Sequence, residues 1–323
     1  VLSPLVLASV VPDSYTPFTV FMLAAALFVP RVIGARNGHD DVMPPSVVAG
    51  LGLGIAMGLA YLSRQEVVWM GLTVLLMQGM VLSWRPTGAR LREAARRLWP
   101  VFVGGLLVVV PWIVRNVVEL GTPMSGQAVG NMFLLDNEDV FAFADPADAG
   151  SYLAQGGTEV VRNIFEAVYD GLVDVLIVPP FPVGLVGLIT IVAMWRAPFL
   201  RRPTALMAVL LSGLFNFVST ALLFPVATLA GTFMHASGAL LVGLAVVAAG
   251  GGDALLARIS ASRDWERPHV VIAPLALVST ALLMTGFPVV LSGSQAQERE
   301  RQIETVTSSL AAHAEATGRA QPE

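Results

Sequence analysis

Residues 204–224 read TALMAVLLSGLFNFVSTALLF and contain no charged side chain. At 1.5 Å per helical residue, about 20 apolar residues cross the roughly 30 Å hydrocarbon core of a bilayer. A backbone amide left without a hydrogen bond is costly in lipid, so a run of this kind has to be helical. The stretch therefore predicts a transmembrane α-helix.

Similar apolar runs recur along the chain. Hydrophobic residues make up 55% of the sequence and charged residues only 13%, about half of what soluble proteins usually carry. We expect an all-α, polytopic transmembrane bundle of about eight spans. These are residues 16–35, 45–62, 66–84, 99–114, 181–197, 204–224, 235–256 and 269–292.

The arginines predict the orientation, because cytoplasmic loops are enriched in basic residues. All nineteen basic residues are arginine, and thirteen of them fall in one alternate set of connections, which we assign to the cytoplasm. Seventeen of the twenty-three acidic residues fall on the other side. This predicts a multi-pass plasma-membrane protein whose long loop, residues 115–180, and C-terminal tail are extracytoplasmic.

The sequence also predicts domain limits. It has no cysteine, and it starts at Val1 inside an apolar stretch. We expect residues 1–292 to form a transmembrane domain that lacks its first spans, and residues 293–323 to begin an outer soluble region. Within the long outer loop, residues 158–176 have apolar side chains at helical spacing, which indicates an amphipathic interfacial helix.

Glycines 50, 52, 54 and 58 punctuate the second predicted span. They superficially resemble a dinucleotide-binding loop, but no strand precedes them and the segment is predicted to lie in the membrane. Close helix packing through small residues is the better interpretation.

The turn Tyr61-Leu-Ser-Arg-Gln-Glu66 places opposite charges between two predicted spans. An ionisable residue near the bilayer needs a partner or water. Arg64 and Glu66 either pair and merely end the helices, or Arg64 binds a phosphate, which suits a planar guanidinium.

A second arginine follows Pro111-Trp112-Ile113-Val114, and the segment continues through Asn116 to Gly121-Thr122-Pro123. Arg115 lies on the predicted outer side, against the charge bias. It is either a boundary anchor or a second contact for an anionic ligand.

Two further candidates face the same side. Asp13 either caps the helix that follows or provides a carboxylate as base, metal ligand or acceptor contact. His235 is either a structural hydrogen-bonding residue or an outer-face site residue, and no second ligand has metal-site spacing with it. Nucleophile-elbow, zinc-helix and phosphate-loop motifs are absent from the sequence.

Taken in order, these segments resemble the GT-C superfamily of integral membrane glycosyltransferases. The similar features are the outer acidic loop, the Gly-rich span ending at Tyr61–Glu66, the basic cytoplasmic loop, Pro111–Pro123 and the turn Gly231-Thr-Phe-Met-His235. Within that superfamily the chain looks most like bacterial protein O-mannosyltransferases and the lipid A aminoarabinose transferase.

The resemblance implies that a sugar carried on a polyprenyl phosphate is transferred, with inversion, to an acceptor on the outer face. Arg64 and Arg115 match the donor phosphate-binding positions, and Glu66, Asn116 and His235 are other outer-face candidates. The family's principal acid follows its first span. That position is expected upstream of Val1, which leaves Asp13 a supporting role.

Two other functions stay open: a transporter or flippase for a lipid-linked or anionic solute, and a non-catalytic membrane scaffold. We find no internal repeat of the transporter kind, and the charges lie at the predicted boundary. The expected partners are the bilayer, the lipid-linked donor and an acceptor, with no nucleic acid. No tightly bound cofactor is implied, and the sequence leaves a divalent metal open.

Overall fold

A computed structural model describes residues 14–35, 46–82, 87–123, 130–136, 139, 148–178, 180–193, 204–229 and 232–263. The chain divides into two units, Val1–Arg263 and Asp264–Glu323, and all described residues belong to the first. Every regular element among them is helical. The predicted span at 269–292, the predicted outer tail at 293–323 and Asp13 lie outside the described residues.

The long helices follow the apolar runs. They are α2 (Tyr15–Ile33), α3 (Val47–Ser63), α4 (Val68–Val81), α5 (Gly88–Leu120), α8 (Gly157–Tyr169), α9 (Val183–Ala193), α11 (Ala205–Leu223) and α14 (Gly238–Arg263). Shorter elements are the 3₁₀ turns η1 (Gln65–Val67) and η2 (Asn131–Phe133), the π-helix η4 (Asp170–Ile177), α7 (Ala149–Ala154), α12 (Pro225–Leu229) and α13 (Thr232–Ala236).

Side-chain caps explain where several helices begin. Ser46 accepts a hydrogen bond from the Ala49 amide, and Thr204 accepts one from the Met207 amide. These bonds satisfy amide groups that have no partner within the first turn of a helix. At the other end of α2, Gly34 takes a left-handed conformation with φ of 69°, which glycine adopts without steric cost.

Three of the described helices are long and apolar enough to cross a membrane: α2, α5 and α11. Shorter apolar helices occupy Val47–Ser63, Gln65–Val81, Val183–Ala193 and Gly238–Ala254. The described part of the chain thus has the helices of a membrane protein. Seven of the predicted runs each contain an apolar helix.

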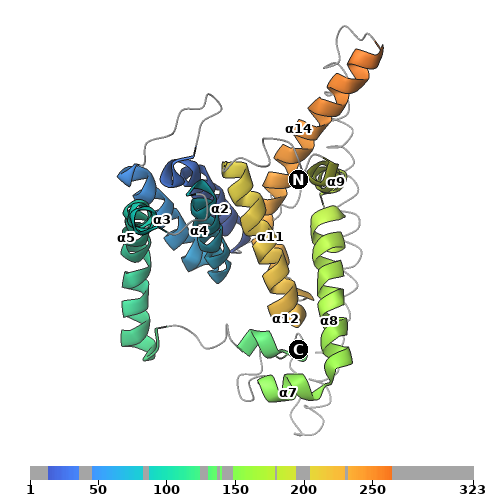
Figure 1. Cartoon of the computed structure of the whole chain (residues 1–323). Helices are drawn as coiled ribbons and strands as arrows, with labels where there is room; N and C mark the ends of the chain where they lie inside the picture. The colour runs from blue at the N-terminus through green and yellow to red at the C-terminus, as the bar shows by residue number, and fades with distance from the viewer. Residues whose placement is uncertain are drawn as a thin grey trace, which may run out of the picture. The chain divides into compact units, whose positions relative to one another are not determined.

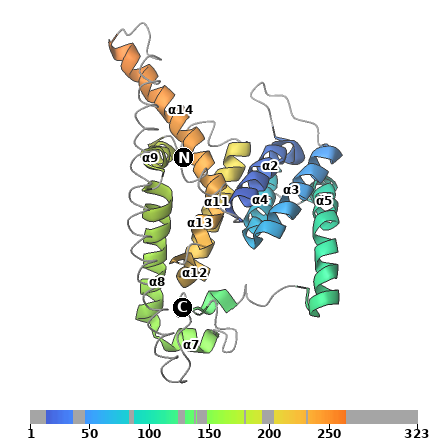
Figure 2. The same ribbon diagram turned by 180° about the vertical axis from the view of Figure 1, so that it is seen from behind.

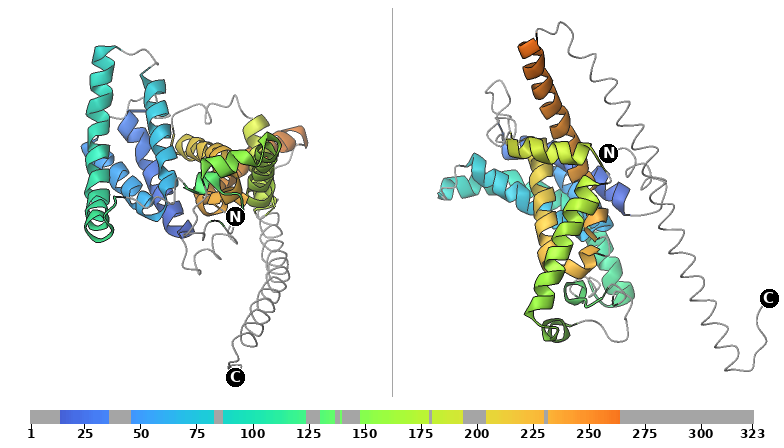
Figure 3. Two further views of the ribbon diagram at one scale, coloured as in Figure 1. Left: turned by 90° about the horizontal axis from the view of Figure 1, so that it is seen from below. Right: turned by 90° about the vertical axis from the view of Figure 1, so that its right-hand side faces the viewer.

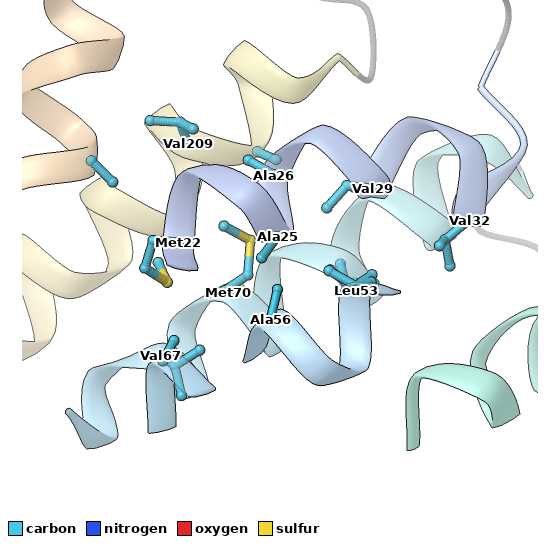
Figure 4. Packing of buried hydrophobic residues seen from close by; sticks show 14 of the residues in the cluster. Met22, Ala25, Ala26, Val29, Val32, Leu53, Ala56, Val67, Met70 and Val209 are labelled. Carbon is cyan, nitrogen blue, oxygen red and sulfur yellow. The ribbon is translucent and has the colours of Figure 1, made fainter. Parts of the chain in front are cut away.

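Helix α2 lies at the centre of the packing. It contacts α3, α4, α11 and α14, and Figures 1 and 2 show it with α4 between α3 and α11. Its buried face meets α3 and α4, where Ala25, Leu53 and Met70 are completely buried. Figure 4 shows these small and flexible side chains interleaved.

The α3–α5 contact is built on glycine. A Cβ on Gly54 would lie 2.8 Å from the Gly105 nitrogen, and one on Gly104 would overlap the Leu51 carbonyl oxygen. On Gly50 and Gly58 it would come within 2.8 Å of a side chain of α5. The two helices therefore meet backbone to backbone, which confirms the prediction of close packing through small residues. Figure 3 shows the helices from below and from the side.

Helix α5 is longer at both ends than the span predicted from the sequence. The span expected at 99–114 is the middle of a helix of 33 residues. Most of the basic stretch expected as a cytoplasmic loop forms its first turns, and Arg115 lies in the helix rather than in a loop that starts there. The prediction was wrong because Pro100 and the arginines interrupt the apolar pattern, although Thr87 caps a helix that begins before them.

One arginine of α5 closes the end of α2. The Arg97 guanidinium donates from Nη1 to the Ile33 carbonyl oxygen, and its Nε lies 2.8 Å from Oε1 of Glu93. A C-terminal carbonyl of α2 has no partner within its own helix. Arg97 supplies one, so the end of α2 is held against α5.

The amphipathic segment predicted at 158–176 is helical, but it is not an α-helix throughout. It is α8 followed by the π-helical η4. Its packed face is formed by Asn163, Ala167 and Gly171, whereas Val161 and Phe165 of the apolar stripe are exposed. Small residues allow the close approach of this segment to α11 and α12. Val161, Phe165 and Leu172 face outward, whereas Val175 and Leu176 near the end of the segment are buried.

Candidate functional site

The site is built around the turn between α3 and α4. Helix α3 ends at Ser63, whose hydroxyl donates to the Leu59 carbonyl oxygen at 3.1 Å. Arg64 is extended, with φ of −157° and ψ of 141°, and Gln65–Val67 then form one 3₁₀ turn. The tight turn was predicted, and it directs the Arg64 and Glu66 side chains toward each other.

Four hydrogen bonds hold the Arg64 guanidinium. Its Nη2 and Nε donate to Oε1 of Glu66 at 2.6 and 3.2 Å. Its Nη1 donates to Oγ of Ser14 at 3.0 Å, and Nη2 also reaches the Thr232 carbonyl oxygen at 3.5 Å. One cation therefore joins the start of α2, the α3–α4 turn and the start of α13.

The Arg64–Glu66 pair is intermediate in burial between a surface ion pair and a fully buried one, since each side chain is 16% exposed. Partial desolvation strengthens the attraction, and it also makes an unpaired charge costly. Because two of its nitrogens bind one oxygen of Glu66, the guanidinium has a fixed orientation. The structure shows the predicted pair and keeps an arginine at this turn in a defined position.

We expect Glu66→Gln to destabilise the protein by about 1 to 3 kcal/mol, between the values typical of exposed and buried pairs. The amide is isosteric but leaves the Arg64 charge without its counter-ion. Thermal unfolding of the purified protein in detergent measures the loss. The double mutant Glu66→Gln with Arg64→Gln should lose less stability than the sum of the two single mutants. Strictly additive losses would show that the two side chains do not interact.

A small cavity adjoins the pair. Glu66 lines it together with Ser212 and Asn216 of α11, and its volume of about 10 Å³ suits roughly one water molecule. Asn216 is 4% exposed, and its Oδ1 accepts no hydrogen bond from the described residues. The side-chain oxygens of Thr19 and Thr228 are likewise buried without such a partner. The bundle around α11 therefore has buried polar groups close to the ion pair.

An apolar groove lies next to the turn. It has a volume of about 420 Å³ and is lined by α3, α4 and α5, with Tyr61 providing its single hydroxyl group. Tyr61 and Val67 both line it, and each is three residues from Arg64. The groove therefore reaches the segment that carries the guanidinium.

The second predicted arginine is placed differently. Arg115 is exposed near the end of α5, and no hydrogen bond or ion pair joins it to Arg64 or to any other described residue. Its neighbour Asn116 is 4% exposed. One turn earlier, the Trp112 ring meets Tyr61 edge-on, with centroids 6.3 Å apart. This contact joins the two arginine-bearing helix ends.

His235 is half-buried in the last turn of α13. The same short helix begins at Thr232, whose carbonyl oxygen accepts the Arg64 bond. His235 thus shares an element with an Arg64 partner. Asp13 is not described, and it directly precedes Ser14 in the chain.

An acidic feature of η4 was not singled out from the sequence. Partial burial, and then the charge of Asp174, raise the pKa of Asp170. The π-helical turn that carries these residues is a form often found at functional positions. No hydrogen bond joins Asp170 to the Arg64 site in the described residues. Among them there is also no group of three or more histidine or acidic residues that could hold a metal ion.

Sequence reasoning missed Ser14, Asn216 and the Thr232 carbonyl. A lone serine and a backbone oxygen carry no signal of their own. Asn216 does carry one, because a single amide in an otherwise apolar span needs a partner.

No family model, curated protein or solved structure matches this chain.

Proposed function

We propose that this protein is a membrane glycosyltransferase of the GT-C type, with about eight spans. It transfers a sugar from a polyprenyl-phosphate donor to an acceptor on the extracytoplasmic face. The observation that carries the proposal is the position of Arg64: an oriented guanidinium on the turn whose flanking residues, Tyr61 and Val67, line an apolar groove. A ligand that joins an anionic group to a long apolar chain matches both parts.

In the proposed complex the isoprenoid chain lies in the groove and the phosphate binds Arg64. Glu66 and Ser14 fix the guanidinium, so it binds the leaving group without first reordering. The acceptor oxygen or nitrogen bonds to the anomeric carbon as the bond from that carbon to the phosphate oxygen breaks. The electron pair leaves on the phosphate, and the acceptor proton passes to a carboxylate, with Asp13 in a supporting role.

Arg115, Asn116 and His235 are proposed as further outer-face residues. Arg115 is exposed and is not committed to any described partner, so it suits a second contact to the phosphate or the sugar. A transfer assay with the full-length protein in liposomes tests the proposal. Radiolabelled sugar should move from polyprenyl phosphate to an acceptor, whereas uptake of the donor into sealed vesicles without transfer would indicate a flippase.

The proposed sidedness can be tested directly because the sequence has no cysteine. Thr158→Cys on α8 and Ala89→Cys on α5 each introduce one exposed thiol. We expect a membrane-impermeant maleimide to label Thr158→Cys in intact cells, and Ala89→Cys only after permeabilisation. The reverse pattern would invert the topology and place Arg64 on the cytoplasmic face.

A further inference from the structure

One face of α5 stays open along most of the helix. Trp99 is 51% exposed and Phe102 is 74% exposed. Large apolar side chains continue this open face at Val103, Leu106, Leu107, Val110 and Val114. Among the described elements α5 packs mainly against α3, through its glycine face. Most of this apolar face is therefore uncovered there, although Phe102 and Leu106 also line the groove with α3 and α4.

The same face becomes basic toward the start of the helix. Arg92 and Arg96 are one helical turn apart, and both are exposed. Residues four apart project from the same side of a helix, and Trp99 follows three residues after Arg96. Neither arginine forms an ion pair with the described residues. They differ in this from Arg97, which binds Glu93 and the end of α2.

The order of residues along α5 places the arginines beside its apolar part. Arg92 and Arg96 lie in the first turns, before Pro100, and the large apolar side chains follow from Trp99 onward. The helix contains Pro100 and Pro111 and bends between its two ends (Figures 1 and 3). Arginines at the end of an apolar helix, with a tryptophan beside them, are typical of the depth of lipid head groups.

We propose that this face of α5 is a binding site for an anionic phospholipid of the surrounding leaflet. The acyl chain lies on the open apolar face and the phosphodiester sits between the Arg92 and Arg96 guanidinium groups. The phosphate also relieves the repulsion between two cations one turn apart. An acidic protein outside the membrane is a poorer match, because it would cover the arginines but not the apolar face that continues from them.

The arginines of this site lie at the end of α5 opposite Arg115, whereas its apolar face shares Phe102 and Leu106 with the groove of the proposed donor site. The inference requires only that α5 cross a membrane. It is tested by head-group preference and not by sugar transfer, so the two proposals can fail independently.

Native mass spectrometry of the full-length protein tests the inference. The protein in detergent is titrated with dioleoyl phosphatidylglycerol or dioleoyl phosphatidylcholine, which differ only in the head group. We expect tighter binding of the phosphatidylglycerol, by about five-fold for each arginine that contacts an anionic surface. Arg92→Gln with Arg96→Gln should remove the preference, and Arg92→Lys with Arg96→Lys should keep most of it.

Arg162→Gln is the matched control, because Arg162 is an exposed helical arginine already paired with Glu159 and Glu166. It should leave the preference intact. Equal binding of the two lipids by the unmodified protein would overturn the inference. An acidic protein partner would then be the better match for the two arginines. An equal loss in Arg162→Gln and Arg96→Gln would also overturn it, since net charge alone would then explain the selectivity.

Discussion

Replacing Arg64 with alanine is expected to lower the rate of sugar transfer by about 100- to 1,000-fold, the range typical for removing one donor to a developing negative charge. The guanidinium is held by Glu66 and Ser14, on the turn that links two residues of an apolar groove, Tyr61 and Val67. No other described side chain is placed in the same way. The measurement is transfer of labelled sugar from polyprenyl phosphate by the full-length protein in liposomes.

Two further variants serve as controls for the loss of transfer in Arg64→Ala. Arg64→Lys keeps the charge but loses the planar fork that contacts Glu66 and Ser14 together, so we expect an intermediate rate. Arg162→Ala removes an exposed arginine from α8 and should leave transfer unchanged. Arg64→Ala also removes the bonds that join α2, the turn and α13, so the melting temperature has to be measured alongside. Full transfer by a folded Arg64→Ala protein would rule out a role for this residue in catalysis.

Gly104→Ala should destabilise the bundle by about 2 to 3 kcal/mol, near the upper part of the range for overpacking. The added methyl group would overlap the Leu51 carbonyl oxygen and lie 3.1 Å from the Ile55 nitrogen. Both are backbone atoms of α3, so α3 and α5 must move apart. Thermal unfolding in detergent measures the effect.

Gly105→Ala is a matched control one residue away. Its new Cβ would meet only the Gly54 carbonyl oxygen, at an ordinary 3.6 Å. Both substitutions gain the same intrinsic helix preference of alanine over glycine, about 1 kcal/mol. The difference between the two variants therefore isolates the packing, and equal melting temperatures would show that α3 and α5 do not touch as described.

Hydropathy predicted the helices well where a cap or a break coincides with the end of an apolar run. Helix α11 follows Thr204 and ends before Pro225, within a residue of the predicted limits. The same logic failed for α5. Its charged first turns belong to the helix because Thr87 caps it and Arg97 binds the end of α2, and neither contact is visible in local hydropathy.

The candidate site was predicted in part. The Arg64–Glu66 pair could be predicted because the two oppositely charged residues lie two positions apart in one short turn. The contacts to Ser14 and the Thr232 carbonyl join residues far apart in the chain, so no local pattern encodes them. Arg115 lies in the last turns of α5, and its function stays a prediction, as does that of Asp13.

The glycine contact between α3 and α5 has a thermodynamic consequence for the helix ends that carry Arg64 and Arg115. Where backbones touch directly, no side chain between them can change rotamer and let the helices slide, so their separation is set before any ligand arrives. The contact of Tyr61 with Trp112 continues this packing toward the ends of α3 and α5. An anion that binds there loses less free energy to ordering the protein than it would between mobile loops.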